Sequence, residues 1–137
     1  MQIENYYTMI HSIFLVGLGG AFGSIFRYLV GIWLKRFAQY GFPWPTFFVN
    51  IMGSLLIGML ICFFANKTSN NLHWQLLLAT GLCGGFTTFS SFTLENIQLI
   101  QEGKITLALL YIAASLLFGL VAVALGMIST RWLLHLV

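Results

Sequence analysis

Four apolar stretches in this chain are each long enough to cross a lipid bilayer as a helix, at residues 10–34, 45–65, 72–101 and 105–134. The hydrocarbon core of a bilayer is about 30 Å thick and needs about 20 helical residues. Charged residues make up only 7% of the 137 residues, against about 25% in soluble domains. The sequence therefore predicts an all-α integral membrane protein with one four-helix domain over residues 1–137, surrounded by membrane lipid. It excludes a soluble enzyme.

The third apolar stretch is too long for a simple crossing and has an unusual centre. An unbroken helix over 72–101 would reach about 45 Å at about 1.5 Å per residue. Residues 84–92 read GGFTTFSSF, which combines two glycines with four hydroxyl residues. We expect Gly84 and Gly85 to interrupt the helix near 84–88, at mid-membrane, and the hydroxyl groups to satisfy the freed backbone.

The links between the stretches predict how the helices run. Only residues 102–104 join the last two stretches, so these must form an antiparallel hairpin. The basic residues are almost evenly divided between the two sides of a four-span chain, with Lys67 and Arg131 on one side and Lys35, Arg36 and Lys104 on the other. Because charge bias sets orientation, a chain without bias could insert both ways. Two copies could then pair as an antiparallel homodimer about a two-fold axis in the membrane plane.

Several features have simpler interpretations. Residues 1–12 lack the basic start and cleavage site of a signal peptide, and we expect a polar and aromatic lead into the first span. Cys62 and Cys83 lie inside apolar runs and fit no metal spacing, which favours buried structural thiols. The three histidines fall near span ends, where interfacial placement is favoured over ligation: His11, His73 and His135. The net charge of +3 is too small and scattered to suggest a nucleic-acid partner.

Small residues recur at a spacing that favours close helix packing. Such positions let helix backbones approach where lipid removes the hydrophobic driving force. They occur in three of the four stretches: Gly19 and Gly23, Ser54 and Gly58, and Ser115, Gly119, Ala122 and Gly126. Helices packed this tightly leave room only for a narrow pathway.

Polar residues at membrane depth are costly and are therefore candidates for function. Arg27 could concentrate an anion in a vestibule, or it could only anchor the end of its helix. Asn50 could donate to a permeating anion, cap a broken helix, or make an ordinary interhelical hydrogen bond. Glu95 could be the carboxylate of a proton-coupled exporter, but a carboxyl group that bonds to a nearby Thr or Tyr is favoured.

The stretch after the glycine pair offers groups that suit a small anion. The spacing of Phe86, Phe89 and Phe92 would place three rings on one helical face after the break. The edge of a phenylalanine ring is electropositive, and Ser90 and Ser91 add hydroxyl donors. The competing interpretation is that these three rings only face lipid or the protein core.

Two other groups complete the candidate sites. Carbonyl groups freed at a break can bind a cation, and Gly84 and Thr87 would supply two per chain at a two-fold axis. Tyr111 and Ser115 lie four residues apart, so their hydroxyl groups share one face of the last helix. That face could form a polar track or make ordinary interhelical bonds.

Three motifs resemble the family of Fluc-type (CrcB) fluoride channels. They are GGAFG at 19–23 followed by Arg27 and Tyr28, TFFVN at 46–50 followed by Gly53, Ser54 and Gly58, and GLCGGFTTFSSF at 81–92. Together with the length and the number of spans, the match covers nearly the whole chain.

The resemblance implies a passive fluoride channel that protects a microbial cell from fluoride, in its inner or plasma membrane. It implies a dual-topology homodimer with two pores and a structural Na⁺ held by main-chain carbonyls of Gly84 and Thr87. It also implies pore residues on three helices and one vestibule residue: Asn50, Phe89, Ser90, Ser91, Phe92, Tyr111 and Ser115, with Arg27 at the wide entrance. Gly119 stands where some relatives continue the track with serine.

Two other functions compete with the channel. Small four-span drug or cation exporters also form dual-topology dimers, but they need an acid in the first span, which here holds Arg27. A structural membrane subunit would have no need of a hydroxyl-rich break. No nucleophile–base–acid set or phosphate loop supports an enzyme.

Overall fold

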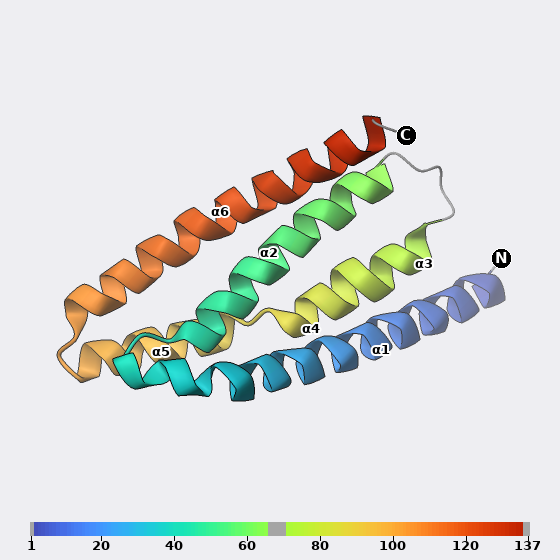
Figure 1. Cartoon of the computed structure of the whole chain (residues 1–137). Coiled ribbons are helices and arrows are strands. Elements are labelled where there is room, and N and C mark those ends of the chain that lie inside the picture. Colours follow the sequence, from blue (N-terminus) through green and yellow to red (C-terminus); the bar gives the residue numbers. More distant parts are fainter. Residues whose placement is uncertain (1, 66–70, 136–137) are drawn as a thin grey trace.

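The computed structural model describes residues 2–65 and 71–135 and consists of helices (Figure 1). The helix α1 covers Gln2–Leu34 and continues into a short 3-10 helix, η1, over Lys35–Tyr40. The helix α2 covers Trp44–Ala65. The last two described helices are α5, Phe89–Gln101, and α6, Ile105–His135.

Three short helical segments follow one another before α5. They are α3 at Leu72–Trp74, the π-helical η2 at Gln75–Cys83, and α4 at Gly84–Phe86. Long π-helical segments are rare and often lie beside functional sites. Here the π-helical segment ends directly before the GGFTTFSSF stretch at 84–92.

Four segments are long and apolar enough to cross a membrane: Tyr6–Phe37, Trp44–Ala65, Leu72–Gln101 and Ile105–Leu134. The predicted all-α class with four membrane spans is thus confirmed. The helix α1 begins at Gln2, so the polar and aromatic lead predicted before the first span is itself helical. Loss of backbone hydrogen bonds is costly near the bilayer, so helix continues into the polar lead.

The last two spans form the expected hairpin. Gly103 has a φ of 76°, and its N–H donates to the carbonyl of Ile100 at 3.0 Å. The N–H of Lys104 donates to the carbonyl of Leu99 at 2.9 Å, which satisfies a second carbonyl at the end of α5. Glycine adopts this left-handed conformation without a steric penalty, which is why it commonly ends helices.

The helices pack in two close pairs, α2 against α6, and α1 against η2 and α4. In Figure 1, α2 lies between α6 and the α3–α4 stretch, and both chain termini lie at one end of the molecule. Glycine makes both contacts possible. A Cβ atom at Gly126 would collide with the carbonyl oxygen of Leu55, and one at Gly23 would collide with that of Leu82. The packing role predicted for these small residues is confirmed.

Candidate functional site

The centre of the candidate site is a pair of extended residues between α4 and α5. Thr87 has φ −82° and ψ 159°, and Thr88 has φ −150° and ψ 115°. The β-branched side chain of threonine suits extended backbone better than helix. Figure 1 shows the two residues as a thin link between helical ribbons.

The expectation that Gly84 and Gly85 interrupt the helix is wrong. Gly84 is helical, with φ −63° and ψ −37°, and both glycines belong to α4. Gly85 instead serves packing, because a Cβ atom there would collide with the backbone carbonyl of Gly20 on α1. The ring alignment expected from the spacing is also wrong, since Phe86 precedes the extended pair and does not share a helix with Phe89.

Thr88 begins α5 as its N-cap. Its hydroxyl oxygen accepts a hydrogen bond from the backbone N–H of Ser91 at 3.2 Å, and the same hydroxyl donates to the Ser91 side chain at 3.0 Å. The hydroxyl of Ser90 lies 3.3 Å from that of Thr88. A side-chain oxygen at this position satisfies one of the free donors of a helix start. The predicted Ser90 and Ser91 hydroxyls therefore gather around Thr88.

Asn50 on α2 holds the extended pair in place. Its amide oxygen accepts from the backbone N–H of Thr88 at 2.8 Å, and its amide nitrogen donates to the carbonyl of Thr88 at 3.1 Å. The side chain thus bonds to Thr88 as a neighbouring β-strand would. Several interpretations were open for Asn50. In the structure its amide group bonds to the backbone of Thr88, at the start of α5.

Arg27 on α1 bonds to the helical turn just before the extended pair. Its Nε donates to the carbonyl of Gly85 at 3.2 Å. Carbonyls in the last turn of a helix lack partners within that helix, and Arg27 supplies one. The side chain is therefore more than a membrane anchor for α1.

The carbonyls of Gly84 and Thr87 are among those that lose their usual partners at the extended pair. In a continuous α-helix, the N–H of Thr88 would donate to the carbonyl of Gly84, and that of Ser91 to the carbonyl of Thr87. Both N–H groups instead bond to side-chain oxygens, those of Asn50 and Thr88. These freed carbonyls are the two named from the sequence as candidate cation ligands.

A cluster of three polar side chains links α2, α5 and α6 near the site. The Thr46 hydroxyl on α2 donates to one carboxylate oxygen of Glu95 at 2.6 Å, and the Tyr111 hydroxyl on α6 donates to the other at 2.9 Å. The favoured expectation for Glu95, a carboxyl group bonded to Thr and Tyr, is confirmed. Thr46 was not among the site residues predicted from the sequence. It lies one helical turn before Asn50, and this spacing could have indicated that the two share a helix face.

The other predicted residues are divided between exposed and enclosed positions. Phe89 is 77% exposed, whereas Tyr111 is fully buried. The Phe89 and Phe92 rings lie 5.9 Å apart at an angle of 38°, and Phe92 meets the Tyr111 ring at 5.0 Å. The hydroxyl of Ser115 is buried and has no hydrogen-bond partner within the described part of the chain.

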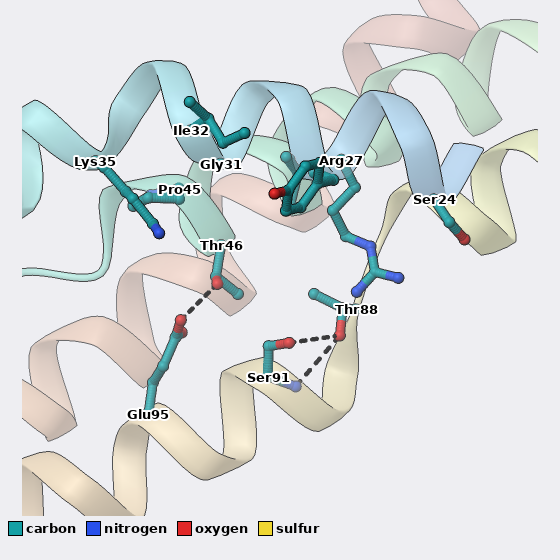
Figure 2. Close-up of a pocket in the computed structure, with 12 residues that line it drawn as sticks. Ser24, Arg27, Gly31, Ile32, Lys35, Pro45, Thr46, Thr88, Ser91 and Glu95 are labelled. Carbon is teal, nitrogen blue, oxygen red and sulfur yellow. Dashed lines mark hydrogen bonds between the residues drawn. The ribbon is translucent and has the colours of Figure 1, made fainter. Parts of the chain in front are cut away.

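Two cavities meet at Thr88. The larger, about 490 Å³, lies among α1, α2 and α5 and is lined by Arg27, Lys35, Thr46, Ser91 and Glu95 together with Thr88 (Figure 2). The smaller, about 390 Å³, lies beyond the extended pair and is lined by Asn50, Ser54, Cys83, Gly84, Thr87, Thr88 and Phe89, among others. Thr88 is the one residue that lines both. Figure 2 shows Arg27 extending from α1 toward it.

The arrangement suits passage of a small anion better than bond-making chemistry. Two basic side chains, Arg27 and Lys35, line the wide cavity, and hydroxyl groups line its inner end. The described residues contain no group of three or more His, Cys, Asp or Glu side chains able to hold a metal ion.

Comparison with known proteins agrees with these features. The family described as "CrcB-like protein, Camphor Resistance (CrcB)" matches residues 14–127. A protein of Agrobacterium fabrum named "Fluoride-specific ion channel FluC" is 48% identical over 120 residues, covering 88% of this chain and 96% of the relative. Proteins with the same name from Rhizobium meliloti, at 45% identity, and Flavobacterium psychrophilum, at 43%, cover 87% and 88% of this chain and 95% and 97% of their own. With its motifs, its four membrane helices and this match over most of its length, the chain belongs to the CrcB family.

Proposed function

We propose that this protein is a fluoride-selective channel in a bacterial cell membrane, where passive efflux protects the cell from fluoride. Membership of the CrcB family supports this function, as do relatives named fluoride-specific ion channels that match nearly end to end. Four apolar helices support a multi-pass membrane location. The protein is a transporter and not an enzyme, since movement of an ion requires no bond to be made or broken.

The observation that carries the proposal is the meeting of two cavities at Thr88. Arg27 and Lys35 would raise the local concentration of an anion in the wide cavity. Fluoride is small and holds its water tightly, so a narrow route must replace that water with hydrogen-bond donors. The hydroxyls of Thr88 and Ser91 line the inner end of the wide cavity, and Asn50 lies just beyond.

The aromatic part of the route is proposed to use Phe89 and Phe92. Ring edges are electropositive and can face an anion without trapping it as a fixed charge would. Within one chain the two rings are tilted toward each other at 38°, and most of the Phe89 ring is exposed. Tyr111 and Ser115 continue with hydroxyl groups on α6. The Ser115 hydroxyl has no hydrogen-bond partner among the described residues and would be a donor for this path.

A second copy in antiparallel orientation would complete the site. The interruption at Thr87 and Thr88 would then lie at mid-membrane, with one pore on each side of the two-fold axis. Two features support a partner at this surface. The Phe89 ring is exposed beside the freed carbonyls, and no other part of the described chain lies within 4 Å of where a Gly84 Cβ would be.

A structural Na⁺ is proposed on the two-fold axis between the copies. The carbonyls of Gly84 and Thr87 have each lost a helical donor, and hard cations take oxygen ligands. Two carbonyls from each chain would give four ligands. The ion would join the two interrupted helices and stabilise the dimer, and it would not itself move fluoride.

The alternative of a proton-coupled cation exporter is disfavoured. Arg27 stands in the first span, where an exporter needs an acid, and it bonds to Gly85. Glu95 is the acid within the spans, and both of its oxygens accept hydroxyl bonds. A carboxylate fixed in this way is a poor site for an organic cation.

The proposal is tested by anion efflux from liposomes that contain the purified protein. Fluoride and chloride release are compared while a potassium ionophore balances charge. Rapid fluoride release with chloride retained is the expected result. Retention of fluoride by liposomes containing well-folded protein would overturn the proposed function.

A further inference from the structure

Two histidines far apart in sequence meet at the end of the molecule that carries both chain termini. The rings of His11 on α1 and His73 on α3 lie 4.7 Å apart between centroids, at an angle of 75°. Both residues are exposed. The sequence favoured interfacial placement over ligation for them, and the fold brings them together (Figure 1 shows α3 beside the N-terminal part of α1).

The nitrogens of this pair are free to bind a ligand. Among the described residues, neither imidazole makes a hydrogen bond to a side chain or to the backbone. A neutral imidazole has one nitrogen with a free lone pair. The χ2 torsion of histidine is broad, and rotation about it turns the nitrogens while the ring centroid stays nearly in place, so both lone pairs can point to one position.

The spacing of the rings matches two imidazoles bound to one metal ion. A nitrogen–metal distance of about 2.0–2.1 Å puts each ring centroid about 3.2 Å from the metal. Two rings are then about 4.5 Å apart at a right angle and about 5.2 Å apart at the tetrahedral angle. The observed 4.7 Å lies between these values.

We propose that His11 and His73 form a binding site for a divalent transition-metal ion of the Cu²⁺, Ni²⁺ and Zn²⁺ class. Imidazole suits these ions, whereas Na⁺, Mg²⁺ and Ca²⁺ prefer oxygen ligands. No third His, Cys, Asp or Glu joins the pair among the side chains that the structure describes. The bound ion would tie the start of α1 to the start of the third membrane stretch. The proposal does not depend on fluoride transport.

Copper binding to protein without a histidine tag gives a direct test. The electron paramagnetic resonance spectrum of bound Cu²⁺ should show coupling to two imidazole nitrogens. His11→Phe and His73→Phe keep a ring for packing but remove the ligand, so each should lower Cu²⁺ affinity at least about tenfold and leave one coupled nitrogen. The matched control is His135→Phe, which should bind like the wild type.

Two results would overturn the site. One is a wild-type spectrum with fewer than two coupled histidine nitrogens, and this measurement needs no variant. The other is wild-type affinity in both His11→Phe and His73→Phe, which would mean that the rings only pack together. Zn²⁺ titration of the same proteins by calorimetry should give the same order of affinities.

Discussion

Asn50 and Thr88 exchange two hydrogen bonds, at 2.8 Å and 3.1 Å, across the gap between α2 and the link from α4 to α5. One amide side chain thereby satisfies both backbone groups of a residue that cannot bond as a helix residue. In a membrane this matters because unsatisfied backbone groups cost several kcal/mol. Asn50 therefore both supports the backbone of the site and lines its smaller cavity.

Removal of this side chain is the first prediction. Asn50→Ala should lower fluoride efflux at least about tenfold and destabilise the protein by about 1–3 kcal/mol, because two polar groups lose their partners. Efflux from liposomes and thermal unfolding in detergent measure both effects. The matched control is Asn96→Ala, since the amide nitrogen of Asn96 donates within its own helix, to Phe92. Asn50→Ala with wild-type efflux would remove Asn50 from the proposed pore.

The second prediction separates charge from hydrogen bonding at Arg27. Arg27→Gln removes both the charge and the bond to Gly85, so it should lower efflux most. Arg27→Lys keeps the charge but not the geometry of Nε, and an intermediate rate is expected. Loss of the bond should cost about 0.5–1.5 kcal/mol in either variant. Arg131→Gln, at the far end of α6, serves as the control and should transport normally. Equal, wild-type rates in both Arg27 variants would refute a role in the vestibule.

The third prediction concerns the hydroxyls that bond to Glu95. Tyr111→Phe keeps the ring contacts with Phe92 and Phe42 and removes only the bond to the carboxylate. Stability should fall by about 0.6 kcal/mol, as for other hydrogen bonds between membrane helices, whereas efflux should fall about tenfold, or about 1.4 kcal/mol in barrier height. Thr46→Val should behave in the same way, and Thr46→Ser, which keeps a hydroxyl, should resemble the wild type. If Thr46→Ser and Thr46→Val transport alike, the hydroxyl is not needed.

The fourth prediction tests the aromatic part of the route. Phe89→Ile and Phe92→Ile should each impair fluoride efflux, because an aliphatic side chain has no electropositive ring edge. Phe89 is largely exposed within one chain, so its replacement should leave the protein folded. Phe14→Ile, at an exposed ring on α1, is the control for a general effect of losing an aromatic group. Unchanged efflux in both pore variants would exclude the aromatic route.

The fifth prediction concerns the proposed Na⁺. Thermal unfolding of the purified protein should occur at a higher temperature in sodium chloride than in N-methylglucamine chloride. At a concentration about 100 times the Kd, bound ion would add about 2.7 kcal/mol of stability. Thr87→Ser keeps the carbonyl ligand and should retain this dependence. Identical unfolding in the two salts would argue against a structural Na⁺.

The sequence by itself determined the architecture of this protein. The length and polarity of the four apolar stretches predict helices, because a bilayer leaves the backbone no other way to satisfy its hydrogen bonds. The three residues between the last two stretches predict their hairpin. The hydroxyl-rich centre of the third stretch marked the site, because such groups are costly at that depth.

Only the tertiary structure decided how the site is built. A glycine pair can weaken a helix or let two helices touch, and the sequence does not distinguish the two. Gly85 lies against the backbone of Gly20 on α1, so this glycine serves helix packing. The extended residues are instead Thr87 and Thr88. The partners of Asn50 and Glu95, like the meeting of His11 and His73, depend on which helix faces lie together. That choice follows from packing between distant segments, whereas helix formation in a membrane is governed by local hydrophobicity and backbone hydrogen bonds.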